Sequence, residues 1–367
     1  MANGCTPLKA LFVADGSGGH LIPALETAAT LASAGAEVRL WYAQRPQTLG
    51  WAHAMARQVV GDRVTVAAIP VAGGARLIDR LRHGSRLWAE AGRCLDTFAP
   101  DVVVGFGGWI SAPVVMAARL RRIKCVIHEQ NAVMGRANRW LAPWVHRVAV
   151  TFPQAGDRRT VKTGLPVRRA IGHAQRGDAA ARFGLDAGRP TLAVIGGSQG
   201  ARAVNRIVVD ALGRALPEEQ HRWQVLHITG PADEAMARQA YAERGIAAHV
   251  TAFLADMADA YAMADVVVSR AGASTIAELA RCGLPAILIP YPHARGHQRA
   301  NARLVAASGG GVVIEESRLA AALLLDTVRR LLADADCRDA MRAGIRTLGV
   351  LDAAQRLSDA IADVARQ

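Results

Sequence analysis

The sequence predicts an α/β protein built from two Rossmann-like domains. The chain has 367 residues, short apolar strands alternate with helical stretches along it, and its two halves open in the same way. A single core rarely grows beyond about 250–300 residues, so this length favours two domains. Alternating strands and helices are typical of parallel sheets covered by helices.

The expected strands are short runs rich in Val, Ile and Leu. In the first half they cover residues 8–14, 37–42, 64–69, 101–105 and 125–128, and in the second half 191–195, 224–229, 250–253, 265–269 and 286–290. Each half opens with a strand and a glycine-rich turn, at 16–19 and at 196–200. Later in each half, Asp-Val-Val-Val precedes a second turn, at 105–108 and at 269–272.

Glycine and proline interrupt this pattern at 163–166, where we expect the linker between the domains. Ligands of such sheets bind beyond the carboxyl ends of the strands. The site is therefore expected in the cleft between the two domains.

Basic residues gather in the first half. The chain carries 44 Lys and Arg against 31 Asp and Glu, and residues 1–165 alone hold 20 against 10. Such asymmetry suits nucleic acid, an anionic membrane surface or a polyanionic substrate. Nucleic acid is the weakest of the three as a partner, because the basic half lacks aromatic stacking motifs.

The cysteines are scattered without a C-x-x-C pair: Cys5, Cys94, Cys125, Cys282 and Cys337. This spacing argues against a zinc or disulfide framework and fits a reducing cytoplasm. No signal peptide is expected at the N-terminus. No apolar run approaches the roughly 18 residues that span a bilayer, so we expect a soluble or peripheral protein.

The turn at 16–19 leads into His20 and a helix that is expected to open at about Leu21. Glycines there let backbone amides approach an anion, and a helix N-terminus favours negative charge. The third glycine of a dinucleotide fingerprint is missing, so NAD is not indicated. A neutral His20 could take a proton from an attacking hydroxyl. A tight turn without a ligand and a purely structural His20 remain open.

Two turns of the second half have the same character. Ser198, in the turn at 196–200, could donate to a phosphate. Near Ser274 a strand gives way to a helix whose free amides and hydroxyls could hold a diphosphate. Glu278 lies on the same helix face as Ser274, where its carboxylate could accept both hydroxyls of a ribose. A capping serine with an exposed glutamate is the structural alternative.

Polar residues also follow two other strands. They are His128, Glu129, Gln130 and Asn131 in the first half, and His293, His297, Gln298 and Asn301 in the second. Neither group has the spacing of a zinc helix. The D-x-D at 334–336 is expected at a solvated helix end, so no divalent metal is indicated.

An apolar stripe with interleaved arginines spans 76–98. Its members alternate at spacings of four and three: Leu77, Leu81, Gly84, Trp88, Ala91, Leu95 and Phe98. Such a stripe usually faces a core. Ile78 and Leu87 fall off it, near several arginines, and an apolar patch ringed by Arg could rest on anionic lipid. Core packing and membrane docking both stay open.

These motifs occur together and in a fixed order. They are 16–20, the Gly-Gly-Trp-Ile-Ser turn at 107–111, the tetrad 128–131, 196–201, 269–278, and His297-Gln298 with Asn301. In this combination the sequence resembles the MurG family of UDP-GlcNAc:lipid I N-acetylglucosaminyltransferases, a part of glycosyltransferase family 28. The resemblance runs from about residue 8 to residue 360.

The resemblance implies a GT-B fold and an inverting reaction without metal or cofactor. The C4 hydroxyl of MurNAc in lipid I (undecaprenyl-diphospho-MurNAc-pentapeptide) would displace UDP from UDP-GlcNAc, giving lipid II for peptidoglycan synthesis. An acceptor- and membrane-facing domain would cover 1–164 and a UDP-GlcNAc-binding domain 165–345. A C-terminal helix within 346–367 would pack back on the first domain. The protein would act peripherally at the anionic cytoplasmic face of the inner membrane, with other cell-wall synthesis proteins as further partners.

Site residues follow from the resemblance position by position. His20 is the candidate base, Arg168 and Ser198 would touch the donor diphosphate, and the backbone at Leu254 would read the uracil edge. The donor-binding set is completed by Ser17, Gly18, Gly19, Asn131, Ala273, Ser274, Thr275, Ile276, Ala277, Glu278 and Gln298. The acceptor-side candidates are Gly107, Gly108 and Glu129.

Three residues depart from the family pattern. Asp15 stands where a glycine is usual, Leu165 replaces the Asn of a Gly-Asn-Pro-x-Arg turn, and Gly296 replaces an Asp. These departures bear on the acceptor side more than on the donor. Other functions share the architecture: transfer to another lipid such as diacylglycerol, UDP-GlcNAc 2-epimerisation, and nucleotide binding without turnover.

Overall fold

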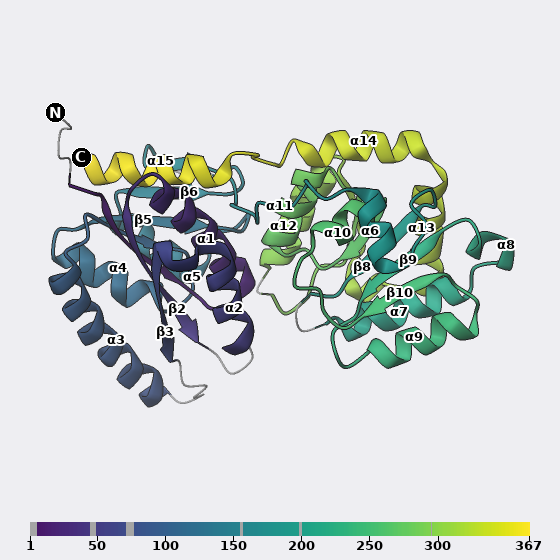
Figure 1. The fold of residues 1–367 in the computed structure, drawn as a ribbon, viewed down its shortest axis with the longest axis horizontal. Coiled ribbons are helices and arrows are strands. Elements are labelled where there is room, and N and C mark those ends of the chain that lie inside the picture. Colours follow the sequence, from purple (N-terminus) through teal and green to yellow (C-terminus); the bar gives the residue numbers. More distant parts are fainter. Residues whose placement is uncertain (1–5, 45–48, 71–76, 155–156, 198–199, 295) are drawn as a thin grey trace. The chain divides into compact units, whose positions relative to one another are not determined.

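The computed structural model describes residues 6–44, 49–70, 77–154, 157–197, 200–294 and 296–367, without the side chains of 49–51 and 77–83. The chain divides into two compact units, one of Met1–Arg168 with Val350–Gln367 and one of Arg169–Gly349 (Figure 1). The boundaries between the units lie at 168/169 and 349/350, whereas the sequence predicted them at 164/165 and 345/346.

A parallel sheet forms the centre of the first unit, in the order β3-β2-β1-β4-β5-β6-β7. Its strands are β1 (Lys9–Ala14), β2 (Glu37–Gln44), β3 (Val64–Pro70), β4 (Val102–Gly105), β5 (Lys124–Glu129), β6 (Arg147–Val150) and β7 (Thr160–Lys162). Side chains of a strand alternate between the two faces. Phe12 and Ala14 therefore enter one core, whereas Leu11 and Val13 enter the other.

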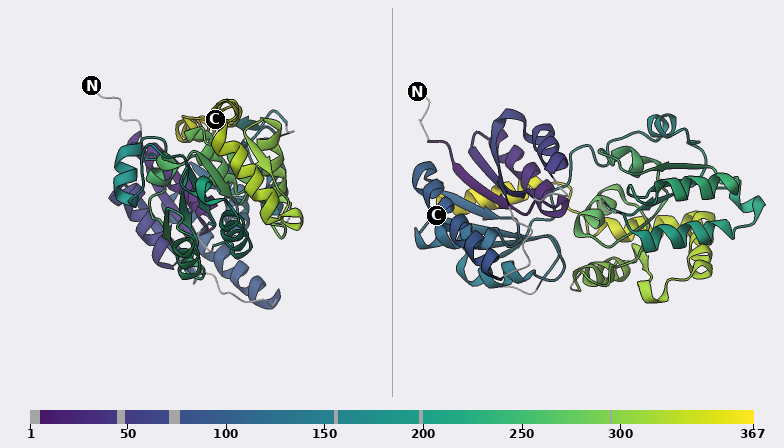
Figure 2. Two further views of the ribbon diagram at one scale, coloured as in Figure 1. Left: turned by 90° about the vertical axis from the view of Figure 1, so that its right-hand side faces the viewer. Right: turned by 90° about the horizontal axis from the view of Figure 1, so that it is seen from below.

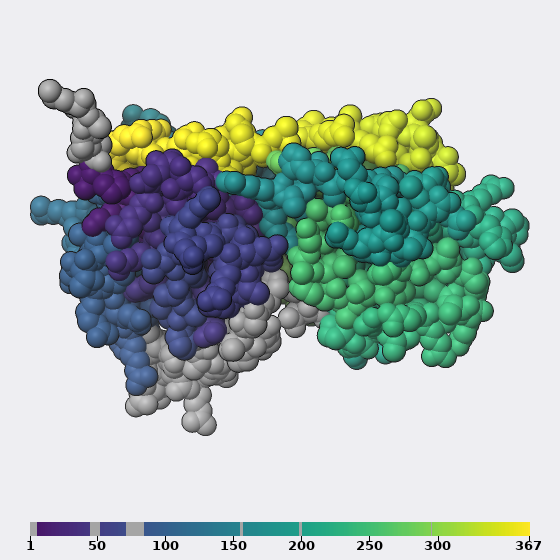
Figure 3. Space-filling view, in the orientation of Figure 1, coloured from purple at the N-terminus to yellow at the C-terminus, as the bar shows by residue number. Residues whose placement is uncertain are grey.

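Helices cover both faces of this sheet. One layer holds α1 (Gly18–Ser33), α2 (Leu49–Val60) and α15 (Ala353–Arg366), and the other holds α3 (Leu77–Phe98), α4 (Ser111–Leu120) and α5 (Arg136–Leu141). The C-terminal helix α15 returns to the first unit and packs beside α1, burying Leu357, Ile361 and Val364 (Figures 1 and 3). The expected return of the last helix is confirmed.

The second unit has a parallel sheet in the order β10-β9-β8-β11-β12-β13. Its strands are β8 (Thr191–Ile195), β9 (Gln224–Ile228), β10 (Ala248–Thr251), β11 (Val266–Ser269), β12 (Ala286–Leu288) and β13 (Gly311–Val313). The helices are α6 (Arg176–Phe183), α7 (Arg202–Gly213), α8 (Pro217–Gln220), α9 (Glu234–Glu243), α10 (Ala258–Met263), α11 (Ala273–Cys282), α12 (His297–Ala307), α13 (Ala321–Ala333) and α14 (Ala335–Arg346). Figure 2 shows both units from two further directions.

Every strand expected from the sequence occurs, and the differences lie at the ends and edges. The strand expected at 250–253 is β10 at Ala248–Thr251. Strands β6, β7 and β13 were not predicted, because three or four residues at or near a sheet edge carry little periodicity. Helix α1 begins at Gly18 rather than Leu21, since Ser17 is the extended N-cap.

Helix α3 corrects part of the predicted apolar stripe. Ala91, Leu95 and Phe98 are buried as expected for core packing. Leu87, a candidate for an exposed patch, is only 4% exposed, whereas Trp88 is 39% exposed. The side chains of Leu77, Ile78 and Leu81 lie outside the described residues. No described helix has the length and apolar content to span a bilayer.

Candidate active site

In each unit the glycine-rich turns follow neighbouring strands. Strand β1 pairs with β4 and β8 pairs with β11, and the chain changes direction across each sheet at these pairs. Because all strands are parallel, the turns after β1 and β4 leave the same edge, as do those after β8 and β11. A crevice at such a reversal is where α/β sheets bind ligands. Each unit therefore brings its own predicted turns together.

His20 lies between the two turns of the first unit. Its Nδ1 is 2.8 Å from the Ser17 Oγ, and a Cβ built on Gly107 would lie 3.0 Å from its Nε2. Gly107 has a φ of +86°, so glycine serves both the backbone conformation and the close approach. If Nδ1–H donates to Ser17, Nε2 is the basic atom.

Asp15 stabilises the turn that carries Ser17. Its Oδ1 accepts the Ser17 N–H at 3.1 Å, and a Cβ on Gly108 would come within 2.6 Å of the Asp15 Cβ. The Ser111 hydroxyl reaches the Gly107 carbonyl at 2.7 Å and fastens the start of α4 to the same turn. The departure at Asp15 is thus a buried side chain that orders the backbone of the turn.

Glu129, predicted as an acceptor-side residue, organises the loop that follows β5. Its Oε1 accepts from the N–H and the Nδ2 of Asn131, at 2.9 and 3.2 Å. Its Oε2 accepts from the Gly135 N–H at 2.9 Å and the Asn138 Nδ2 at 2.8 Å. Both oxygens of this buried carboxylate are therefore engaged with the loop, and what they position is Asn131.

His128 is a core residue beneath the site. Its Nε2 lies 3.0 Å from the Gly164 carbonyl, so this nitrogen carries the proton. Burial lowers the pKa of His128 to about 4, although the hydrogen bond to Gly164 and the charge of Glu129 act in the opposite direction. The ring is consequently neutral at physiological pH, and its hydrogen bond joins the end of β5 to Gly164.

In the second unit, the start of α11 has the features of an anion site. Gly272 is its extended N-cap, one residue before the helix begins at Ala273. The Ser274 Oγ is buried and has no hydrogen-bond partner among the described residues. A buried hydroxyl beside the unpaired amides of a helix N-terminus calls for an acceptor, and a phosphate supplies one.

Glu278 lies one turn deeper in α11 and is 7% exposed. Its Oε2 accepts a hydrogen bond from the Tyr261 hydroxyl on α10 at 2.7 Å. Tyr261 was not predicted as a site residue, and a contact between residues 17 positions apart on different helices leaves no periodic signal. This hydrogen bond orients the carboxylate.

Gln298 joins α12 to the turn that precedes α11. Its Oε1 accepts the N–H of Ala271 at 3.2 Å and of Tyr291 at 2.9 Å, and Asn301 donates to the Ala271 carbonyl at 3.1 Å. These two hydrogen bonds fix the orientation of the Gln298 amide: its oxygen faces the backbone, and its NH₂ group is left as the donor. Gly296, the N-cap of α12, has a φ of +81°, which explains glycine at this departure.

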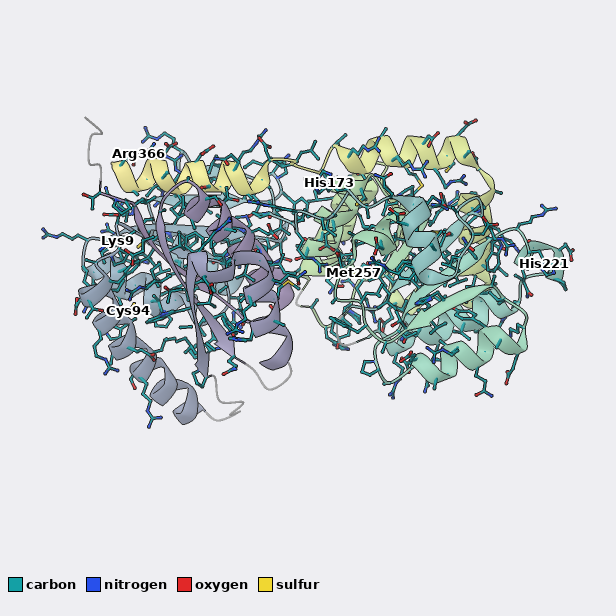
Figure 4. All side chains as sticks on the ribbon, in the orientation of Figure 1. Lys9, Cys94, His173, His221, Met257 and Arg366 are labelled. Atoms are coloured by element: carbon teal, nitrogen blue, oxygen red, sulfur yellow. The ribbon has the colours of Figure 1, made fainter. Side chains whose placement is uncertain are left out.

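The remaining predicted residues lie on the same elements or at their margins. Gly18 and Gly19 form the first turn of α1, and Thr275, Ile276 and Ala277 lie on α11. Ile276 is fully buried, and its N–H donates to the Gly272 carbonyl at 3.0 Å. Leu254 lies in the loop before α10, whose N-cap Met257 is labelled in Figure 4. Arg168 ends the first segment of unit one, and Ser198 lies outside the described residues.

The likeness to known proteins extends along the chain. The models of the glycosyltransferase family 28 N-terminal and C-terminal domains match residues 10–150 and 191–357. A protein of Syntrophotalea carbinolica is 38% identical over 362 residues, 95% of this chain and 97% of its own. The chain belongs to glycosyltransferase family 28.

Within family 28, the relatives with high identity share one name. The Syntrophotalea protein and one of Chromohalobacter salexigens, 39% identical over 95% of each chain, are both named UDP-N-acetylglucosamine–N-acetylmuramyl-(pentapeptide) pyrophosphoryl-undecaprenol N-acetylglucosamine transferase. The crystal structure of Acinetobacter baumannii MurG matches with a TM-score of 0.76 at 27% identity, covering 97% of this chain and 100% of that one. The predicted GT-B fold and glycosyltransferase class are confirmed.

Proposed function

We propose that this family 28 enzyme transfers GlcNAc from UDP-GlcNAc to the C4 hydroxyl of MurNAc in lipid I, forming lipid II for peptidoglycan synthesis. One observation carries the proposal: relatives named for this donor and acceptor match 95% of the chain. The proposed reaction uses neither a metal nor an organic cofactor.

The donor would be held mainly by the second unit. Amides at the start of α11 and the Ser274 hydroxyl would bind the diphosphate, with Arg168 and Ser198. Glu278 would accept the ribose hydroxyls, and Gln298 would donate to the GlcNAc hydroxyls. As UDP leaves, negative charge grows on the diphosphate, and donors already fixed in place stabilise it without reorganising.

The first unit would supply the base and the acceptor contacts. His20 Nε2 would take the C4 proton as the C4 oxygen bonds to C1 of GlcNAc and the C1–O bond to UDP breaks. Attack on the face opposite UDP inverts the configuration at C1 and gives a β-1,4 link. Ser17, Asn131 and the turn around Gly107 and Gly108 would line the reacting groups.

Initial rates of UDP release test this function directly. The full chain is assayed with UDP-GlcNAc and a lipid I analogue, with diacylglycerol, or without acceptor. We expect UDP release only with the lipid I analogue. Release with diacylglycerol alone, UDP-ManNAc formed without acceptor, or UDP binding without turnover would each contradict the proposal and identify the corresponding alternative.

We also propose that the face formed by α4, α5 and the segment after α5 meets the anionic inner membrane from the cytoplasm. Trp140 and Trp144 are 55% and 51% exposed there. Arg136 and Arg139 are exposed beside them. Tryptophan favours the membrane–water interface, and arginine is attracted to anionic head groups.

Co-sedimentation with phosphatidylglycerol vesicles tests this surface. The double variant Trp140→Ser with Trp144→Ser should bind the vesicles several-fold less than the unaltered chain does. Added salt should weaken vesicle binding by both proteins. Leu216→Ser serves as the control, because Leu216 is equally exposed (53%) on the second unit. Undiminished vesicle binding by the double variant would exclude this face.

A further inference from the structure

A chain of buried polar side chains crosses the second unit from α9 to α7. The Tyr241 hydroxyl lies 2.9 Å from His227 Nδ1, and His227 Nε2 lies 3.2 Å from Asn205 Oδ1. The Asn205 Nδ2 donates to the Thr229 carbonyl at 2.7 Å and to Asp233 Oδ2 at 2.8 Å. All five residues are at most 6% exposed. Polar groups this deep in a core are retained only with their hydrogen bonds satisfied.

The acceptors at one end set the direction of every hydrogen bond in this chain. A carbonyl and a carboxylate can only accept, so the amide of Asn205 must present its NH₂ group to Thr229 and Asp233. Its oxygen then accepts from His227 Nε2–H, which leaves Nδ1 to accept from Tyr241. Burial also lowers the pKa of His227 to about 3, so the ring stays neutral.

Asn205 connects this chain to the glycine-rich turn after β8. It lies in the first turn of α7, where its N–H donates to the Ala201 carbonyl at 2.8 Å. A Cβ on Gly200 would lie 2.6 Å from the same Thr229 carbonyl that accepts from Asn205. At the start of the turn, the Gly196 N–H donates to the Ile228 carbonyl at 3.1 Å. The described ends of the turn, at Gly196 and Gly200, therefore both contact the C-terminal end of β9.

We propose that His227 and Tyr241 are positioning residues for the donor, acting through Asn205 to hold Gly196, Gly200 and Ala201, the described residues at the two ends of the turn after β8. This rests on the proposed function, in which that turn binds the diphosphate of UDP-GlcNAc. Without His227 the buried Asn205 Oδ1 loses its donor, and a shift of the side chain toward another donor strains its hydrogen bond to the Thr229 carbonyl, against which Gly200 packs. The loss falls on donor binding, because all five residues of this hydrogen-bonded network lie in the second unit and none in the proposed acceptor-side unit.

Steady-state kinetics with UDP-GlcNAc and a lipid I analogue test the proposal on three variants of the full chain. His227→Leu removes both hydrogen bonds and should raise the donor KM about tenfold, with the acceptor KM unchanged. His227→Gln keeps a donor and an acceptor on one planar group and should recover most of that loss. His249→Leu is the control on the neighbouring strand β10, where the imidazole contacts Phe183 through its carbonyl, at 2.9 Å, and its ring.

An unchanged donor KM in a folded His227→Leu enzyme would overturn the proposal, as would equal losses for donor and acceptor. If His227→Leu does not fold, Tyr241→Phe decides the question: a donor KM raised about threefold supports the proposal, and an unchanged one overturns it. Failure of the proposed function is distinct, because the unaltered chain would then show no transfer to the lipid I analogue.

Discussion

His20, His128 and His227 are one residue type in three environments. His20 lies at the start of α1 with Ser17 on one nitrogen and the Gly107 turn near the other. His128 and His227 are fully buried, and burial lowers the pKa of both. Their surroundings thus differ: His128 and His227 are neutral hydrogen-bonding groups of the core, whereas His20, the proposed base, lies at the partly exposed start of α1.

Ser17→Ala tests the tautomer of His20. Without the Ser17 oxygen, Nδ1–H loses its acceptor, and the tautomer with a basic Nε2 is no longer favoured. We expect kcat for transfer to fall about tenfold or more while the donor KM changes little. Ser85→Ala, an exposed serine of α3, is the control. A kcat equal to that of the unaltered enzyme would exclude Ser17 from this role.

Glu278→Ala tests the ribose contact. If this buried carboxylate accepts the ribose hydroxyls as proposed, its removal should raise the KM for UDP-GlcNAc by about ten- to hundredfold. Tyr261→Phe keeps the carboxylate and loses only its orienting hydroxyl, so a smaller rise is expected. Equal donor KM values for Glu278→Ala and the unaltered enzyme would remove Glu278 from the ribose site.

His128 makes the stability of the first unit depend on pH. Its pKa of about 4 in the folded chain lies below the value of about 6.5 in an unfolded one, so the unfolded chain binds the proton first as pH falls. The stabilisation is complete above about pH 6.5 and is lost progressively towards pH 4, by up to about 3 kcal/mol. His128→Gln should flatten this dependence in melting curves recorded between pH 7 and 4. An unchanged pH slope would contradict the assignment.

At the scale of elements, the turns after the central strands have a stricter geometry than the helices they open. Gly107 and Gly108 both have a positive φ, and their Cα atoms pack against His20 and Asp15. The loop after β5 is ordered by the inward carboxylate of Glu129. The backbone of these turns and of this loop is thus held in place by the side chains of His20, Asp15 and Glu129.

Gly108→Ala tests that geometry. Its φ of +79° disfavours an L side chain, and the new Cβ would lie 2.6 Å from the Asp15 Cβ. We expect destabilisation by about 2 kcal/mol or more, measured by urea denaturation. Gly84→Ala is the matched control in the interior of α3, where no atom of the part of the chain that the structure describes lies within 4 Å of the new Cβ. It should instead stabilise by about 0.5–1 kcal/mol, and destabilisation of equal size at both sites would refute the argument.

At the scale of the whole molecule, the chain leaves the first unit and later returns to complete it. Gly164, near the exit, has a φ of +79° and packs against Val350 and Ala353 at the return. Helix α15 then closes one face of the first sheet with Leu357, Ile361 and Val364. The core of unit one is therefore incomplete without Leu357, Ile361 and Val364 of α15.

Leu357→Ala tests this closure. A cavity at a fully buried leucine should destabilise by about 2–5 kcal/mol. In calorimetry the transition of the first unit should move to lower temperature while that of the second unit stays in place. Leu351→Ala is the control, because Leu351 is 74% exposed. A shift of the second unit's transition instead would contradict the division into units.

The sequence by itself determined the alternation of strands and helices, the glycine turns at the strand ends and the family. These are local properties, because side-chain periodicity and the backbone freedom of glycine act within a few residues. Only the tertiary structure decided that Glu129 turns inward, that Leu87 is buried and Trp88 half exposed, and that Tyr261 orients Glu278. Such contacts depend on the register in which distant elements pack, and no short stretch of sequence encodes that register.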